Sequence, residues 1–190
     1  MLKDVLIISG SPKKEGNTSL LVGWFAEGAK SAGANVEIIR AADLEHKVMG
    51  CTSCRACQKS SSYRCVINDA VSDCVARFSS ADVIVMATPL YFFGASSQLK
   101  CIIDRMFSLY KWDNAANTME TPLKGKTFVF LGSGFEDAGF EAFESPFRLT
   151  AEYSGMFYKS LVIKNAGISG DIIKLPDVRL KAIELGKEVV

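Results

Sequence analysis

The amino-acid sequence predicts an α/β fold: a doubly wound, five-stranded parallel sheet between two layers of helices. Short apolar runs rich in β-branched residues alternate regularly with longer segments that have helical character. That alternation is typical of a parallel sheet whose helices lie on both faces, a three-layer α/β/α arrangement. No repeat, low-complexity tract or linker divides the 190 residues, so we expect a single domain over residues 1–190.

The first half of the chain contains the signals for three strands. Residues 3–8 form the first apolar run, and a helix is expected to follow over residues 18–33, ending at a glycine. The second strand is expected over residues 36–39, and the third, the clearest buried run of the chain, over residues 82–87. Between them, Asp69 suits the N-cap of a helix with an apolar face of Val71, Cys74, Val75 and Phe78.

The second half adds two strands and three helices. The strands are expected over residues 127–131 and 157–163, and a polar loop through Trp112, Asn114, Asn117 and Pro122 precedes the first of them. The helices are expected over residues 97–110, over residues 140–153 with a break or kink near Pro146, and from Pro176 to about residue 188.

Two unusual loops follow the first and third strands. If the strand order is 2-1-3-4-5, the chain reverses direction across the sheet between these two strands, and ligands of such sheets bind at that point. The loops at residues 9–19 and 88–94 would then meet at one crevice. The loop after the fourth strand, Gly132-Ser133-Gly134-Phe135, should form its far wall.

The first of these loops has the composition of a phosphate site. It places backbone N–H groups and the positive end of a helix dipole at one point. The spacing of Gly10 and Gly16 fits neither G-x-x-x-x-G-K-[ST] nor G-x-G-x-x-G, so a terminal monophosphate such as that of FMN suits it better. Taken alone, a polar helix N-terminus that binds nothing is an equal alternative. We expect the donors to come from Ser9, Ser11, Lys13, Gly16, Asn17, Thr18 and Ser19.

The second loop contains three consecutive aromatic residues. Neighbouring extended residues point in different directions, so Tyr91, Phe92 and Phe93 cannot all face the core. At least one should border an open pocket and cover a flat ring, where Gly94 permits close approach. For Phe92 or Phe93 individually, packing under a helix or at a subunit contact is an equal alternative. The predicted ring-binding residues are Pro89, Leu90, Tyr91, Phe92, Phe93 and Gly94, with Ser133 and Gly134 opposite.

These motifs, in their order, resemble those of a known family. The motifs are Ser9-Gly10-Ser11-Pro12 with Gly16-Asn17-Thr18, Cys51-x-x-Cys54-x-x-Cys57, Pro89-Leu90-Tyr91-Phe92 and Leu99-Lys100-x-x-Ile103-Asp104-Arg105. Over about residues 1–135 the sequence resembles the flavodoxin-like NADPH-dependent FMN reductases, and most closely their iron–sulfur flavoprotein branch. The resemblance implies FMN as prosthetic group, a nicotinamide or protein electron donor, and a homodimer or homotetramer with flavins near subunit contacts.

Four cysteines lie in an aperiodic insertion at about residues 45–68. Cys51, Cys54 and Cys57 form a compact triplet, and Cys65 follows after seven residues. A triplet with a more distant fourth thiolate suits a [4Fe–4S] cluster better than structural zinc. The iron–sulfur flavoprotein resemblance supports a cluster, but a cluster-free loop stays an equal alternative. Cys74, Cys101 and the single histidine, His46, are interpreted as structural or solvated residues.

Composition limits the function classes. The net charge is +1, which predicts neither nucleic-acid nor anionic-membrane binding, and no segment predicts a secretory signal or membrane span. We therefore expect a cytoplasmic protein whose six cysteines serve metal or redox chemistry.

The resulting hypothesis is an FMN-dependent NAD(P)H oxidoreductase that passes electrons to a small acceptor or through the cluster, with no side chain assigned as catalytic. The alternatives are an electron carrier for ferredoxin-like partners and a thiol-based redox sensor. Flavodoxin-like carriers are usually strongly acidic, and this nearly neutral chain therefore favours the enzyme.

Overall fold

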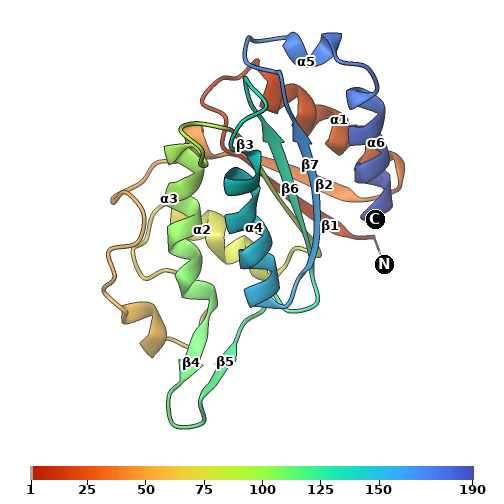
Figure 1. Ribbon diagram of the computed structural model, residues 1–190. Coiled ribbons are helices and arrows are strands. Elements are labelled where there is room, and N and C mark those ends of the chain that lie inside the picture. The colour runs from red at the N-terminus through yellow and green to blue at the C-terminus, as the bar shows by residue number, and fades with distance from the viewer. Residues whose placement is uncertain (1) are drawn as a thin grey trace.

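The central element is a five-stranded parallel sheet with the strand order β2-β1-β3-β6-β7 (Figure 1). The computed structural model describes residues 2–190. The strands span β1 Asp4–Ser9, β2 Asn35–Arg40, β3 Val83–Pro89, β6 Thr127–Ser133 and β7 Phe157–Ile163. Because β6 and β7 are the fourth and fifth strands of this sheet, the predicted order 2-1-3-4-5 is confirmed.

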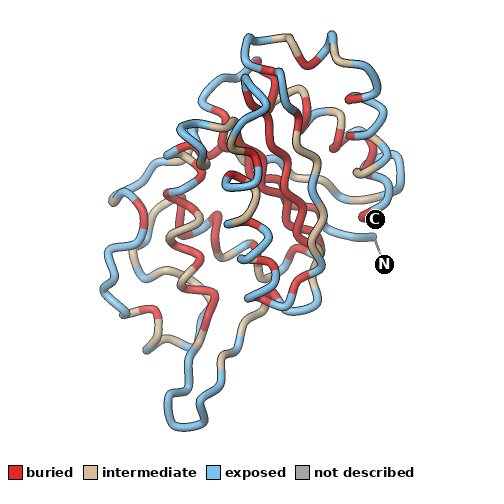
Figure 2. Tube along the Cα trace, in the orientation of Figure 1, coloured by how far each residue is buried: buried red, intermediate tan, exposed pale blue. Residues whose placement is uncertain are grey.

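Helices cover both faces of the sheet (Figure 1). One face carries α1 (Asn17–Ser31) and α6 (Val178–Glu188), and the other carries α2 (Ala70–Ala76), α3 (Ser97–Arg105) and α4 (Phe140–Ser154). Successive strand residues point to opposite faces. Each central strand is therefore buried on both sides, which Figure 2 shows as red strands inside a paler shell. This explains why the strands read as continuous apolar runs.

The two helical layers enclose two separate cores. With α1 and α6, the sheet buries Val5, Ile7, Val83, Val85, Val129 and Leu131. With α2, α3 and α4, it buries the alternate residues Leu6, Ile8, Ile84, Met86, Phe128 and Phe130. The second core is richer in aromatic rings, and Phe130 stacks on Phe147 of α4 at 4.0 Å between centroids.

Side-chain caps begin two of the helices on the second face. Asp69 Oδ1 accepts a hydrogen bond from the Ser72 N–H at the start of α2, as its sequence position predicted. Ser96 Oγ accepts one from the Leu99 N–H at the start of α3. Each cap satisfies a backbone donor that the first helical turn leaves free.

Several element boundaries differ from the sequence prediction. Pro146 lies inside α4 without breaking it, so the predicted break is wrong. The expected polar loop after α3 contains the hairpin of β4 (Lys111–Asp113) and β5 (Thr118–Glu120), which projects from the body in Figure 1. Its strands are too short to give a periodic signal. A short helix α5 (Asp171–Lys174) precedes α6, which begins two residues after Pro176.

The cysteine-rich insertion is mostly irregular. Between β2 and α2, residues 41–69 contain only two short 3₁₀ turns, η1 (Ala41–Asp43) and η2 (Ala56–Lys59). The remaining 3₁₀ turns are η3 (Arg77–Ser79), after α2, and η4 (Met106–Leu109), after α3. Across residues 2–190, no helix has the length and apolar character that crossing a membrane requires.

Candidate functional site

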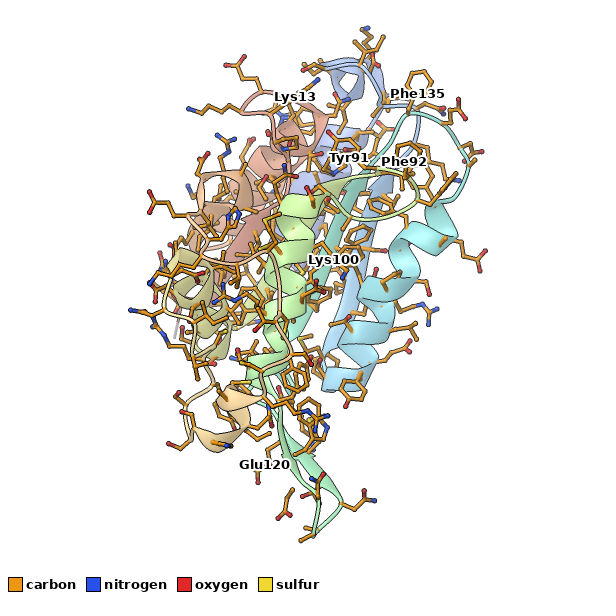
Figure 3. The ribbon with its side chains drawn as sticks, turned by 90° about the vertical axis from the view of Figure 1, so that its left-hand side faces the viewer. Lys13, Tyr91, Phe92, Lys100, Glu120 and Phe135 are labelled. Carbon is orange, nitrogen blue, oxygen red and sulfur yellow. The ribbon has the colours of Figure 1, made fainter. Side chains whose placement is uncertain are left out.

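A cleft opens at the carboxyl ends of the sheet strands, where the two predicted loops meet. Its volume is about 290 Å³, close to the lower end of the range for small-molecule sites, and it is partly open to solvent. Its lining comes from four strand ends and the residues that follow them: Ser11, Lys13 and Gly16 after β1, with Asn17 and Thr18 at the start of α1; Pro89 at the end of β3, with Leu90 and Tyr91 after it; Ser133 at the end of β6, with Gly134 and Phe135 after it; and Ala166, Gly167 and Ser169 after β7. Figure 3 shows Lys13, Tyr91, Phe92 and Phe135 at this end of the molecule.

Ten of the fifteen residues predicted to bind the cofactor line this cleft. The other five are not among its lining residues: Ser9, Ser19, Phe92, Phe93 and Gly94. Ala166, Gly167 and Ser169 were missed, although the small residues after the last strand lie at the same sheet edge. Their position after the last strand could have predicted them, because the loops at the carboxyl ends of parallel strands lie along the same edge of the sheet.

The N-terminus of α1 presents free backbone donors to the cleft. The Gly16 N-cap offers no side-chain hydrogen bond, and no acidic residue lies in the first turn. The first N–H groups of a helix lack intrahelical partners, and the helix dipole adds positive potential there. Lys13 is the one charged side chain among the lining residues. The geometry therefore favours an anion.

The hydroxyl groups of the loop mainly hold the loop itself. Ser11 Oγ accepts from the Lys13 N–H at 3.3 Å and donates to the Lys13 carbonyl at 3.2 Å. Ser19 Oγ donates to the same carbonyl at 3.1 Å. These bonds form a closed turn over residues 11–19 that orients Lys13. Ser19 thus supports the loop from outside the cleft lining.

Asn17 joins this loop to the wall that follows β7. Its Nδ2 donates to the carbonyls of Ala166 at 2.7 Å and Ile168 at 2.8 Å. Its Oδ1 accepts from the N–H groups of Gly170 at 3.0 Å and Ile172 at 3.3 Å. Both amide hydrogens of Asn17 are thereby used in bonds to the protein backbone. The side chain of Asn17 therefore positions the loop, and it does not provide the ligand donor that the sequence analysis expected.

A hydroxyl pair connects two walls of the cleft. Thr18 Oγ1 and Ser133 Oγ lie 2.9 Å apart, and both residues are buried. Nearby, the Leu90 N–H donates to the Ser133 carbonyl at 2.7 Å, and Ser96 Oγ donates to the Gly10 carbonyl at 2.6 Å. A Cβ on Gly10 would lie 2.7 Å from Leu99 Cβ, so only glycine fits there. These contacts tie the walls of the cleft to one another.

The aromatic loop forms a tight hairpin turn at the cleft mouth. Tyr91 and Gly94 exchange two backbone hydrogen bonds of 3.0 Å, which leaves Phe92 and Phe93 as the two turn residues. Their φ angles are +45° and +63°, a region that Asn and Gly adopt far more easily than Phe. Phe92 is fully exposed, while the Phe93 ring covers Gly139 where a Cβ would otherwise stand.

The cysteine-rich segment packs against the C-terminal half of α3, whereas this turn precedes the start of the helix. Cys51 and Cys54 are exposed, Cys65 is half-buried and Cys57 is buried. Hydrogen bonds from the Ala56 N–H and the Thr52 hydroxyl lower the pKa of the exposed Cys54 thiol. Within residues 2–190, no three His, Cys, Asp or Glu side chains form a metal-binding group. The four thiols therefore share one segment without being gathered at one point.

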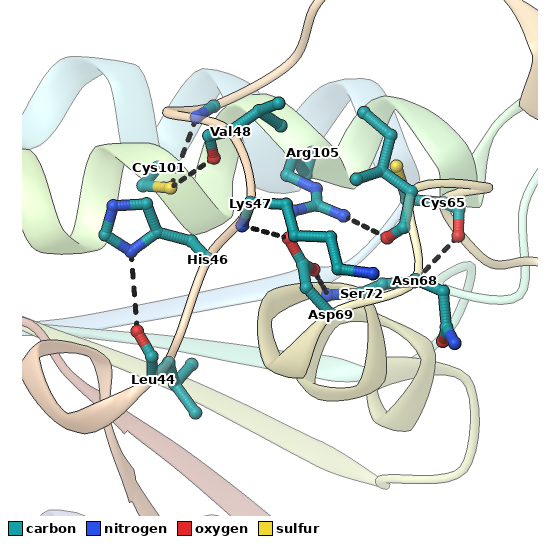
Figure 4. A network of polar contacts seen from close by, with 12 residues as sticks. Leu44, His46, Lys47, Val48, Cys65, Asn68, Asp69, Ser72, Cys101 and Arg105 are labelled. Carbon is teal, nitrogen blue, oxygen red and sulfur yellow. Dashed lines mark hydrogen bonds and ion pairs between the residues drawn. The ribbon is translucent and has the colours of Figure 1, made fainter.

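A buried ion pair joins both ends of this segment to the body of the fold (Figure 4). Arg105 of α3 donates from Nη1 to Asp69 Oδ2 at 2.7 Å and from Nη2 to the Ile67 carbonyl at 2.7 Å. Asp69 Oδ2 also accepts from the Lys47 N–H at 3.0 Å. Burial opposes ionisation of Asp69, but these hydrogen bonds outweigh it and lower the pKa of Asp69 to about 2.

The remaining two cysteines are buried in the body of the protein. Burial raises the pKa of the Cys74 thiol to about 12, so this group stays protonated. Cys101 Sγ accepts from the Gly50 N–H at 3.2 Å and thereby packs the cysteine-rich segment against α3. Both positions agree with the structural interpretation of these residues.

Comparison with solved structures shows that the fold is shared widely. An NAD(P)H:quinone oxidoreductase from Methanothermobacter marburgensis superimposes with a TM-score of 0.77 at 15% identity, covering 100% of both chains. An FMN-dependent NADH-azoreductase from Bacillus anthracis gives 0.73 at 15% identity, covering 98% of this chain and 99% of that one. A flavodoxin from the Archaea gives 0.59 at 12% identity over 98% and 95%. These likenesses establish a flavodoxin-like fold.

Comparison of sequences relates the chain to curated proteins. It is 39% identical over 101 residues to an iron-sulfur flavoprotein of Methanocaldococcus jannaschii, covering 53% of this chain and 50% of that protein. An iron-sulfur flavoprotein of Methanosarcina thermophila is 34% identical over 98 residues, covering 52% and 49%. The matches thus span about half the length of these relatives. Residues 4–168 match the profile of the NADPH-dependent FMN reductases, and the chain belongs to that family.

Proposed function

We propose that this protein is an FMN-dependent NAD(P)H oxidoreductase. The observation that carries the proposal is the single cleft in which the N-terminus of α1, Lys13 and the aromatic turn come together. A phosphate site beside an apolar, aromatic wall suits a phosphorylated planar ring. Family membership supports the same cofactor.

The lining residues fit the two ends of FMN. The N–H groups at the start of α1, the Thr18 hydroxyl and Lys13 would hold the phosphate, whose charge no acidic lining residue opposes. Leu90, Tyr91 and Gly134 would border the ring, and the backbone of the Tyr91–Gly94 turn would approach its polar edge. Bound FMN would supply the chemistry by accepting hydride from NAD(P)H and passing electrons on.

The protein contributes position and shape to this reaction. Among the lining residues, only Lys13 and Tyr91 carry titratable groups, so the cleft contains no histidine or carboxylate for acid–base catalysis. Ser133 and Thr18 brace the walls, and Asn17 fixes the loop after β7. We therefore assign cofactor-binding roles and no catalytic side chain.

The test is flavin binding followed by NAD(P)H oxidation with purified protein. We expect FMN fluorescence to be quenched at one FMN per chain, and NADH or NADPH to be oxidised when a quinone or ferricyanide is added. Thr18→Val, which removes a hydroxyl from the cleft, should weaken FMN binding about 10-fold. Thr127→Val is the matched control, because Thr127 begins β6 at the end of the strand away from the cleft and does not line it.

Two results would contradict the proposal in different ways. If the purified protein binds no FMN, the proposed FMN-dependent activity is wrong. Protein that binds FMN but oxidises neither nicotinamide, while exchanging electrons with a ferredoxin, would instead support a non-enzymatic electron carrier.

We further propose that Cys51, Cys54, Cys57 and Cys65 hold a [4Fe–4S] cluster. Four thiols on one segment are the donor set that such a cluster requires, and the curated relatives carry the name iron-sulfur flavoprotein. Because the thiols are not gathered, the exposed Cys51–Cys54 stretch would have to close on binding. Iron and sulfide analysis of anaerobically purified protein tests this. A reversible disulfide without iron would favour the thiol-sensor alternative.

We also propose a cytoplasmic homodimer or homotetramer. All six cysteines are free thiols, which suits a reducing compartment. Between α3 and α4 an apolar groove is lined by Phe107, Tyr110, Trp112, Leu149 and Tyr153, of which Trp112, Leu149 and Tyr153 are exposed. Light scattering should give a multiple of the 20.7 kDa chain mass. A monomer at micromolar concentration would contradict this proposal.

A further inference from the structure

Phe92 is a large apolar residue whose position the single chain does not explain. Its side chain is 100% exposed, and its φ angle of +45° is one that phenylalanine rarely adopts. The neighbouring Phe93 is strained in the same way, at +63°. Phe92 is also not among the residues that line the cofactor cleft. Strained turns of this kind are maintained at sites of function, so the exposed ring points to a contact with another molecule.

A cavity of about 160 Å³ opens beside this turn, between α3, α4 and the sheet. It reaches from the exposed Lys100 and Pro146 down to the buried Met86 of β3. Gly94, which ends the turn of Phe92, also lines it. Figure 3 shows Lys100 on α3 and Phe92 beyond the N-terminal end of that helix. The exposed ring and the cavity are therefore neighbours on the surface of the molecule.

The lining of the cavity suits an apolar ring. Its two polar side chains already have partners, because the Lys100 ammonium pairs with Asp104 and Thr150 Oγ1 donates to a backbone carbonyl of α4. Water would find few partners there, and an apolar cavity of about 150 Å³ stays dry and binds benzene. The volume thus matches the ring of one phenylalanine. The larger apolar side chains of the lining are Met86, Ile103, Met106, Phe128, Phe143 and Phe147.

The apolar surface around the cavity is large enough for a symmetric contact. The cavity continues into the groove between α3 and α4, because Ile103, Met106 and Thr150 line both. At about 150–250 Å² for each fully exposed aromatic side chain, the exposed apolar groups of the groove and the turn present about 600 Å² per copy. A standard interface buries about 800 Å² per partner, so neighbouring polar residues need to add only the remainder. The exposed apolar groups are Phe92, Phe93, Trp112, Leu149 and Tyr153.

Charge does not oppose the meeting of two such faces. Helix α3 contributes the pair Lys100 and Asp104, and α4 contributes the pair Arg148 and Glu152. Each helix therefore carries both signs of charge beside the groove, and two identical faces do not repel each other. A two-fold contact uses the same surface on both copies. An exposed ring and a cavity on one surface can then each find a partner at the same time.

We propose that two copies of the chain form a two-fold dimer in which Phe92 of each copy inserts its ring into the cavity between α3 and α4 of the other. The inference deepens the homodimer proposed above and rests on it. The contact gives Phe92 the burial that offsets its strained turn, and it fills an apolar cavity of matching volume. Because Phe92 belongs to the Tyr91–Gly94 turn, the contact also brings the mouth of the cofactor cleft to the subunit boundary.

The experiment measures the dissociation constant of the dimer by analytical ultracentrifugation. Phe92→Asn removes the exposed ring, and Ile103→Phe places a ring from the same copy in the cavity. Because the symmetric dimer buries two phenylalanine rings, Phe92→Asn should raise the dissociation constant at least about 100-fold. Ile103→Phe should also weaken the dimer. Leu180→Asn is the matched control and should have little effect, since it removes an exposed apolar side chain from α6, on the other face of the sheet.

Mixing the two variants separates the proposed contact from a general loss of stability. In the mixed dimer, Phe92 of the Ile103→Phe chain meets the open cavity of the Phe92→Asn chain, so one contact is intact. Neither variant has an intact contact when it pairs with itself. Native mass spectrometry should therefore find more mixed dimers than the roughly one half that random pairing gives.

The outcomes distinguish this inference from the homodimer on which it rests. Wild-type protein that stays monomeric at micromolar concentration would overturn both. A wild-type dimer whose dissociation constant Phe92→Asn leaves unchanged would overturn only this inference, and so would random pairing of the two folded variants. If Ile103→Phe does not fold, the comparison of Phe92→Asn with Leu180→Asn still decides, because both change exposed side chains.

Discussion

The side chains around the cleft divide into those that face the open space and those that hold its walls. Asn17 makes four hydrogen bonds to backbone groups about 150 positions further along the chain. Each buried polar group satisfied in this way avoids a desolvation cost of about 1–3 kcal/mol. Phe92 shows the opposite situation, since a large apolar residue is held exposed in a left-handed turn. Within residues 2–190, no burial of the Phe92 side chain offsets the backbone strain of this turn.

Replacing Phe92 by asparagine should stabilise the cofactor-free protein at dilutions at which its chains are separate. Asparagine adopts positive φ more easily, so about 1 kcal/mol of backbone strain should be relieved. No burial is lost, because Phe92 is fully exposed. Urea unfolding measures the change. Phe93→Asn is the comparison variant: its ring covers Gly139, so its gain should be smaller. A less stable Phe92→Asn protein would show that the turn is not strained.

At the scale of elements, close helix packing positions the phosphate loop. Helix α1, which begins in the cleft, makes its largest helical contact with α6. A Cβ on Gly28 would lie 2.0 Å from the Ile183 carbonyl oxygen, and one on Gly186 would lie 2.1 Å from that of Phe25. Two glycines therefore let the helix backbones touch, which fixes the direction in which α1 presents its N-terminus.

Gly28→Ala should destabilise the protein by about 3 kcal/mol, because the new methyl group meets backbone that cannot rotate away. Gly23→Ala in the same helix should instead stabilise the protein. Gly23 is exposed with nothing within 4 Å, so alanine should add about 0.5–1 kcal/mol through helix propensity. Chemical denaturation of both variants checks the pair. Equal effects would show that α1 and α6 are not in close contact.

The segment between β2 and α2 should loosen in acid. The pKa of Asp69 is about 2 in the folded protein and about 3.9 in an unfolded chain. The unfolded state therefore binds the proton first as pH falls. The stabilisation, about 2 kcal/mol and complete above about pH 5, is lost mostly as pH falls from about 4 to about 2. Asp69→Asn should lack this component. If both proteins lose stability equally between about pH 4 and about pH 2, Asp69 is not the group responsible.

At the scale of the whole molecule, the cleft gathers loops from four strands of the sheet. Residues as distant as Ser11 and Ser169 line it. A ligand there binds only the folded chain, so its binding energy adds to the stability of the entire fold.

FMN should accordingly raise the melting temperature of the whole protein in one cooperative transition. At 100 times the dissociation constant, the added stability is about 2.7 kcal/mol, which corresponds to roughly 5–10 °C for a chain of this size. Differential scanning fluorimetry or calorimetry measures the shift. Riboflavin at the same concentration is the control and should give a smaller shift, since it lacks the phosphate. Equal shifts would argue against a phosphate site at α1.

The sequence by itself determined the layered fold, the order of the sheet and the place of the cleft. Strands that are buried on both faces appear in the sequence as continuous apolar runs, which identifies the layered fold. The loops at the carboxyl ends of parallel strands lie along one edge of the sheet, which identifies the place of the cleft. Only the tertiary structure decided that Asn17 braces a distant wall, that residues 166–169 complete the cleft, and that Arg105 forms a buried ion pair with Asp69. These contacts join residues 36 or more positions apart, and no local periodicity records which distant groups will meet.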